Sequence, residues 1–210
     1  MGRYQTEGNV QQEFNEHFPS GTGQLAFSLW KRTGMLHLKW KVYRSLYGDS
    51  PERVDLLNWS APVFFAILDD VLLDDVLLEI ARMTDSDRTG RWENASIQKL
   101  ITILPPEDVA EHSWSVKLSE LHALSDRIRT IRDKRLAHAD LDSAVRYHDD
   151  PLPGVSRAYV EDVLKGIRDL LGSIENKYRA TRTAHQDFLP PIGGVDALVR
   201  VLEEAHSRAS

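Results

Sequence analysis

The chain has 210 residues, 41% hydrophobic and 28% charged, which is typical of a folded globular protein and excludes a disordered one. Lys and Arg total 26 against 32 Asp and Glu, so the net charge of −6 excludes a uniformly basic coat for nucleic acid. Cysteine is absent, which excludes disulfides, thiolate nucleophiles and cysteine-bound metals. The most apolar run, residues 61–68, is too short for a membrane span, and the N-terminus has no apolar leader. We therefore expect a cytoplasmic protein that does not enter a membrane.

The N-terminal third predicts one loose segment followed by two long helices. Residues 1–23 are polar and end in a turn-like Pro-Ser-Gly-Thr-Gly run, so we expect them to be loosely ordered. Residues 24–47 have apolar positions at helical spacing. Ser50-Pro51 is typical of a helix start, and Pro62 should kink or divide the helix that follows, up to about residue 84. The core side expected for that helix consists of Leu56, Trp59, Val63, Ile67, Val71 and Leu78.

The rest of the chain predicts two more long helices with short accessory ones. Apolar residues at steps of three and four mark the core stripe of the third long helix as Leu118, Leu121, Leu124, Ile128 and Ile131. The expected elements are a loop, a short helix, a long helix, a loop and a long helix over residues 85–95, 96–104, 107–138, 139–154 and 156–183.

No alternating apolar pattern indicates a strand pair, so we expect an all-α fold, a helical bundle of four to five long helices. We expect residues 24–185 to form the bundle, and residues 186–210 to add a short C-terminal helix packed on it.

Two acidic patterns are candidate metal sites. Carboxylates four and five residues apart lie along one side of a helix and could hold Mg²⁺. The candidate ligands are Asp69, Asp70, Asp74 and Asp75. A solvated helix face is the simpler explanation, because no second acidic helix matches them. The stretch from Asp85 to Ser96 opens like a calcium loop, but its twelfth residue is not the Glu that calcium requires.

The most informative stretch is basic. Residues 126–138 hold five Lys or Arg and two Asp, a local charge of +3. Arg129, Arg132, Arg135 and His138 recur at every third residue, so on a helix they form a stripe beside the core face. Such a stripe can bind a phosphate, or it can be an exposed helix end whose charge suits the helix dipole.

The run from Arg132 to His138 resembles the signature of the HEPN superfamily (higher eukaryotes and prokaryotes nucleotide-binding). That signature is an Arg, a polar Asn or Asp next to it, and a His after a gap of four to six residues. Here the gap is five, and Asp133 fills the polar position. In addition, residues 80–85 followed by 94–97 resemble a branch tied to abortive infection, a form of phage defence. The resemblance covers roughly residues 25–185.

The resemblance implies a metal-independent endoribonuclease without a cofactor, in which two chains pair so that both motifs line one cleft. His138 would act as general base on the ribose 2′-hydroxyl, and Arg132 would stabilise charge on the phosphate. Asp133 would orient a partner side chain. The products would be a 2′,3′-cyclic phosphate and a 5′-hydroxyl. The remaining basic side chains would bind RNA, namely Arg129, Lys134 and Arg135.

The resemblance also bears on how the protein would be regulated, and two other functions stay open. Some toxins of the superfamily carry a Tyr two residues after the His, where a nucleotidyltransferase antitoxin modifies it. This chain has Asp140 there, so we do not expect that modification, although an antitoxin partner stays open. The rival functions are a non-catalytic helical module that binds RNA or protein, and an Mg²⁺-dependent enzyme of the acidic helix.

Overall fold

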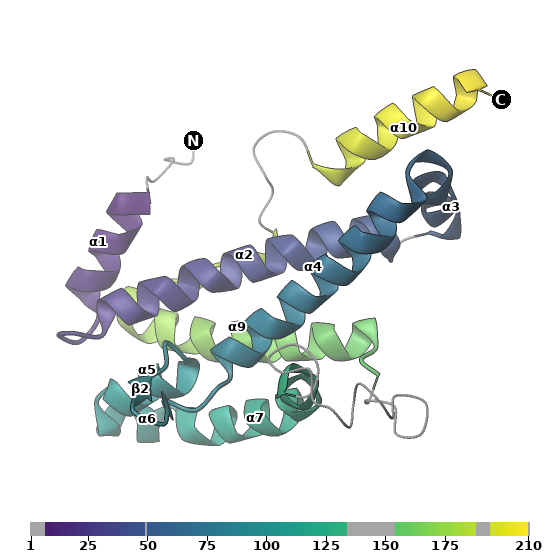
Figure 1. Ribbon diagram of the computed structural model, residues 1–210. Coiled ribbons are helices and arrows are strands. Elements are labelled where there is room, and N and C mark those ends of the chain that lie inside the picture. Colours follow the sequence, from purple (N-terminus) through teal and green to yellow (C-terminus); the bar gives the residue numbers. More distant parts are fainter. Residues whose placement is uncertain (1–6, 49, 134–153, 188–193, 210) are drawn as a thin grey trace. The chain divides into compact units, whose positions relative to one another are not determined.

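Helices make up almost all of the computed structural model (Figure 1), which confirms the all-α class. The structure describes residues 7–48, 50–133, 154–187 and 194–209. The described α-helices are α1 (Glu7–His17), α2 (Gly23–Tyr47), α3 (Pro51–Ser60), α4 (Pro62–Met83), α5 (Ile97–Ile103), α6 (Pro106–Glu111), α7 (Trp114–Ile131), α9 (Arg157–Arg179) and α10 (Val195–Ala209).

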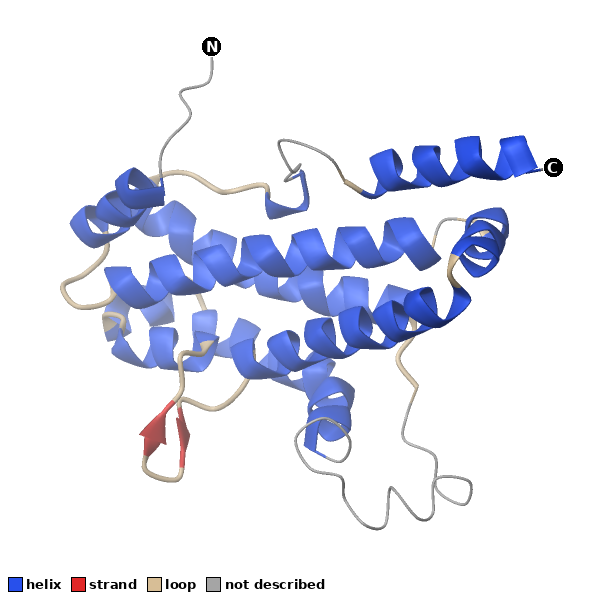
Figure 2. Cartoon of the chain, turned by 45° about the horizontal axis from the view of Figure 1, so that its top comes forward, coloured by secondary structure: helices blue, strands red, loops and turns tan. Residues whose placement is uncertain are grey.

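Two short elements complete the described chain. A 3₁₀ turn, η2, covers His185–Asp187. The strands β1 (Arg88–Thr89) and β2 (Trp92–Glu93) pair antiparallel, red in Figure 2, where we expected a loop without strands. No described helix is both long enough and apolar enough to cross a bilayer.

The chain divides into two compact units that are each discontinuous in sequence. Unit 1 combines residues 1–33 with 78–184, and unit 2 combines residues 34–77 with 185–210. The helices α2 and α4 therefore contribute one end to each unit.

The core of unit 1 is built where α7 and α9 pack together. The stripe expected on α7 is buried at four of its five positions, and Leu124 is partly buried. On α9, Gly166 allows close approach, because a Cβ there would lie 3.0 Å from Leu121. The helix expected over 107–138 is two helices, because Ser113 between α6 and α7 has a left-handed backbone, with φ of 53°.

Helix α1 stands where we expected a loosely ordered segment. Val10 and Phe14 are buried on one side of it, at helical spacing, and Phe18 follows. Phe14 stacks on Phe18, with ring centroids 5.2 Å apart, and also contacts Phe27 and Trp30. These aromatic contacts order the segment. The polar sequence around Phe14 did not predict them, because two of the three partners lie in the next helix.

In unit 2, Pro62 divides the predicted helix as expected. Ser50 caps α3, since its hydroxyl accepts from the Arg53 backbone N–H at 3.1 Å. The core side expected for the helix over residues 51–84 is wrong at four positions, because Trp59 on α3 and Val63, Ile67 and Val71 on α4 are 46–72% exposed. One cluster of buried residues in unit 2 consists of Leu46, Leu57 and Phe65, with part-buried neighbours from α2, α4 and α10. Because the apolar residues of α4 are spread over several sides of the helix, its sequence period does not select one face.

Candidate functional site

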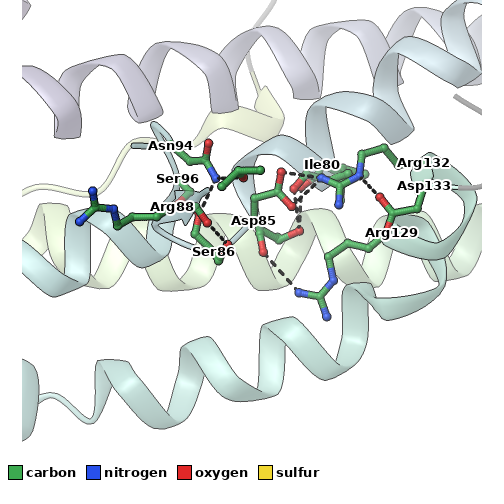
Figure 3. A network of polar contacts seen from close by, with 12 residues as sticks. Ile80, Asp85, Ser86, Arg88, Asn94, Ser96, Arg129, Arg132 and Asp133 are labelled. Carbon is green, nitrogen blue, oxygen red and sulfur yellow. Dashed lines mark hydrogen bonds and ion pairs between the residues drawn. The ribbon is translucent and has the colours of Figure 1, made fainter. Parts of the chain in front are cut away.

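A polar network in unit 1 joins the end of α4, the hairpin that follows it and the end of α7 (Figure 3). Helix α4 ends at Met83, and the next hydroxyl, of Thr84, bonds back to the Ile80 carbonyl at 2.9 Å. Asp85 then meets Arg132, which lies 47 residues later in the chain. Among the described residues, the structure thus brings Asp85, from the stretch that resembles the abortive-infection branch, into contact with Arg132, the first residue of the stretch that resembles the HEPN signature.

Arg132 is the centre of this network. Its Nη1 donates to both carboxylate oxygens of Asp85, each at 2.5 Å, and its Nε donates to Oδ1 of Asp133 at 2.7 Å. The Arg132 and Asp85 side chains are about four-fifths buried, whereas Asp133 is 63% exposed. Burial lowers the pKa of Arg132, but the hydrogen bonds to both carboxylates outweigh it and raise that pKa overall. The guanidinium therefore stays charged.

One nitrogen of Arg132, Nη2, has no hydrogen-bond partner among the described residues. Within the described part of the chain, Nη2 donates no hydrogen bond, although Nη1 and Nε both do. A guanidinium has five N–H donors in one plane, so a further anion can bind at Nη2 without breaking the pair with Asp85. This is the chemistry that a phosphate oxygen requires.

Arg129 lies one turn earlier and has different partners. Its Nη2 donates to the His122 carbonyl at 2.9 Å and to Asp126 at 3.3 Å, and its Nη1 donates to the Thr84 carbonyl at 3.4 Å. Arg129 thus satisfies a backbone oxygen at the end of α4. The two described arginines of the expected basic stripe, Arg129 and Arg132, pair with carboxylates. Those carboxylates belong to Asp126, Asp85 and Asp133, so this part of the stripe is not a bare cationic surface.

The hairpin fixes the backbone that follows Asp85. Asn94 donates from Nδ2 to the Ser86 carbonyl at 2.9 Å and to the Thr89 hydroxyl at 2.8 Å. The Ser96 hydroxyl donates to the same Ser86 carbonyl and accepts from a backbone N–H at the start of α5, which it caps. The polar residues that resemble a calcium loop therefore build a hairpin and a helix cap.

Sequence reasoning assigned no chemical role to Asp85 or to His122. Nε2 of His122 is buried and has no hydrogen-bond partner within the described residues. Burial lowers the pKa of His122, the charge of Arg129 lowers it further, and Asp85 opposes this in part. The sequence signal was available in principle, because a residue seven positions before Arg129 lies on the same helix face.

The remaining predicted site residues, Lys134, Arg135 and His138, lie outside the described residues. Of the predicted site residues, the structure therefore describes only Arg129, Arg132 and Asp133.

The acidic helix has other contacts. Asp75 pairs with Lys39 at 2.6 Å. Together with burial, which is the larger cause, the charge of Asp69 raises the pKa of Tyr47 to about 12. In the described ranges, no three His, Asp or Glu side chains are grouped so that they could hold a metal ion. The Mg²⁺-dependent alternative therefore receives no support from the described part of α4.

Comparison with known proteins gives a match to a family model. The model described as HEPN_AbiU2: AbiU2 matches residues 23–198, a range that includes Asp85, the hairpin and the whole stretch from Arg132 to His138. No curated protein and no solved structure matches the chain.

Proposed function

Because the chain belongs to the AbiU2 family of HEPN-like abortive-infection proteins, we propose that it is a metal-independent endoribonuclease that acts as a homodimer in phage defence. One observation carries the proposal. The signature arginine, Arg132, is held charged and partly exposed, with Nη2 available to an anion within the described part of the chain. A preorganised cation of this kind stabilises charge that develops on a phosphate in the transition state.

The proposed reaction needs only protein side chains. His138 takes the proton of the ribose 2′-hydroxyl, and the freed oxygen attacks the adjacent phosphorus. The bond from phosphorus to the 5′-oxygen breaks, and His138 of the second chain protonates that oxygen. The products are a 2′,3′-cyclic phosphate and a 5′-hydroxyl. Arg132 stabilises the phosphate charge, and Asp133 holds its Nε.

Binding of RNA is assigned to the other basic residues of the stretch. Lys134 and Arg135 would contact the RNA backbone. Arg129 donates to Thr84 and His122, which favours a role in fixing the site beside any direct contact with RNA. The whole chain has a net charge of −6 although residues 126–138 carry +3, so the rest of the chain is acidic and limits salt-driven binding to nucleic acid there.

The test is cleavage of total RNA in excess EDTA by wild type, His138→Ala and Arg132→Ala, with 2′,3′-cyclic phosphate ends as the readout. We expect each variant to lose at least about a hundredfold in rate. His17→Ala and Arg91→Ala are matched controls, because His17 on α1 and Arg91 in the hairpin are both exposed. Both control variants should cleave RNA at the wild-type rate. An inert wild type, or cleavage that survives His138→Ala, would overturn the proposal. Sedimentation of the wild type tests the dimer.

A non-catalytic RNA- or protein-binding module is the second candidate. The observation in its favour is that two carboxylates, of Asp85 and Asp133, already compensate the charge of Arg132. Such a module would bind RNA or a protein partner without cleavage, and EDTA, His138→Ala and Arg132→Ala would leave the RNA chain length unchanged.

A further inference from the structure

Resting on the proposed function, we propose that Asp85 is a positioning residue of the nuclease. Its carboxylate holds Nη1 of Arg132 in place, so that Nη2 of the same guanidinium remains available to the phosphate. Neither the superfamily signature nor the spacing of the basic stretch assigns this role to Asp85.

Hydrogen bonds hold the residues on both sides of Asp85. On one side, Thr84 is fully buried, its hydroxyl bonds to Ile80, and its carbonyl accepts from Arg129. On the other side, the carbonyl of Ser86 accepts from both Asn94 and Ser96. Hydrogen bonds therefore hold the backbone immediately before and after Asp85, and its carboxylate lies between these two anchored residues (Figure 3).

Asp85 is better placed than the other partner of Arg132 to fix the guanidinium. In the described part of the chain, its other partner is Asp133, the adjacent residue, which is largely exposed. A neighbouring side chain moves with the same stretch of backbone, so it does not fix the guanidinium relative to the rest of the molecule. Asp85 comes from the end of a different helix and does so. A displacement of about 1 Å at a reacting centre is enough to cost about a hundredfold in rate.

The negative charge of Asp85 allows a positioning role to be distinguished from a role in RNA binding. A carboxylate at the site repels the RNA backbone, so Asp85 opposes substrate binding by its charge. Removing that charge while keeping the shape should leave RNA binding as tight as before, or tighter. The same change should lower the rate of cleavage, because Arg132 is then poorly placed. Loss of a merely structural contact would weaken both.

The experiment compares Asp85→Asn with wild type in EDTA. We measure kcat and KM for a cleaved RNA oligonucleotide, and Kd for the fully 2′-O-methylated RNA of the same sequence, which lacks the attacking hydroxyl. We expect kcat to fall about ten- to hundredfold while Kd stays equal or decreases. The matched control is Asp162→Asn, which removes the same charge from an exposed position on α9 and should change neither quantity.

Asp85→Glu is the second variant, in case the amide does not fold. It keeps the charge of the pair but moves the guanidinium by one methylene, so we expect an intermediate kcat and an unchanged Kd. Parallel loss of kcat and binding, an unchanged kcat or faster cleavage in Asp85→Asn would each overturn the assignment. A wild type that cleaves and needs Arg132 but not Asp85 overturns this inference alone. An inert wild type overturns the proposed function as well.

Discussion

Two arginines near the ends of long helices in unit 1 have similar partners and different surroundings. Arg132 follows α7, and Arg179 is the last residue of α9. Each pairs with two carboxylates. Nη1 of Arg179 donates to Glu175 at 2.6 Å, and its Nη2 donates to Glu13 at 2.5 Å. Its guanidinium also lies over the Phe14 ring, 4.4 Å from the centroid. In Arg179 both terminal nitrogens and one face of the guanidinium are occupied.

The carboxylate of Glu175 extends the contrast. It accepts from both the backbone N–H and the hydroxyl of Thr183, each at 2.9 Å, and that hydroxyl accepts from Trp30 Nε1 at 2.8 Å. Arg179 thus ties α1, α2, α9 and the segment after α9 into one buried network. The side chain of Arg179 is 9% exposed against 19% for Arg132. A terminal nitrogen without a partner among the described residues, together with partial exposure, distinguishes Arg132 as the arginine suited to bind a substrate.

The largest effect on stability is expected for Arg179→Met. The change leaves Glu175, which is 5% exposed, without its counter-charge, so the free energy of unfolding should fall by about 3–5 kcal/mol. Urea unfolding followed by circular dichroism measures it. A loss below about 1 kcal/mol would contradict the view that this network anchors α1.

Arg132→Met should destabilise less, by about 1–2 kcal/mol. The carboxylate that it strands, on Asp85, is 22% exposed, so water replaces part of the lost pairing. The same urea experiment applies. If Arg132→Met cost as much as Arg179→Met, the distinction between a closed and an open arginine would be wrong.

A smaller effect, dependent on pH, is expected at His122. Its pKa in the folded state lies below 6.5, the ordinary value, through burial and the charge of Arg129. As pH falls below about 6.5, the unfolded chain takes up this proton first, so stability is kept above that pH and decreases below it. His122→Gln should therefore lose less stability than wild type between pH 7 and pH 5. The exposed His17→Gln is the control, and an unaltered slope in His122→Gln would contradict the expectation.

The smallest effect is expected for Asp126→Asn. This carboxylate is 74% exposed and reaches Arg129 at 3.3 Å, three residues along α7. Exposed pairs of this kind contribute little, so unfolding should change by less than about 0.5 kcal/mol. A larger loss would show that Arg129 depends on Asp126 as well as on the carbonyls of Thr84 and His122.

Local features of the chain were readable from the sequence. The cap at Ser50, the division at Pro62 and the buried stripe of α7 each depend on residues a few positions apart, and all three occur in the structure. The all-α class follows from such features, and the family match agrees with the resemblance found in residues 80–85, 94–97 and 132–138.

Three other features were decided by tertiary structure alone. The exposed face of α4 was mistaken for its core face, because a helix that is apolar on most sides has no preferred face until neighbours pack on it. The order in α1 depends on Phe14 meeting α2 and α9. The partner of Arg132 is Asp85, 47 residues away, and only folding brings them together. Short-range patterns in the sequence predict most of the long helices and the signature arginine, because both depend on residues a few positions apart. Packing decided which faces are buried and which carboxylate holds that arginine, because both depend on contacts between distant segments.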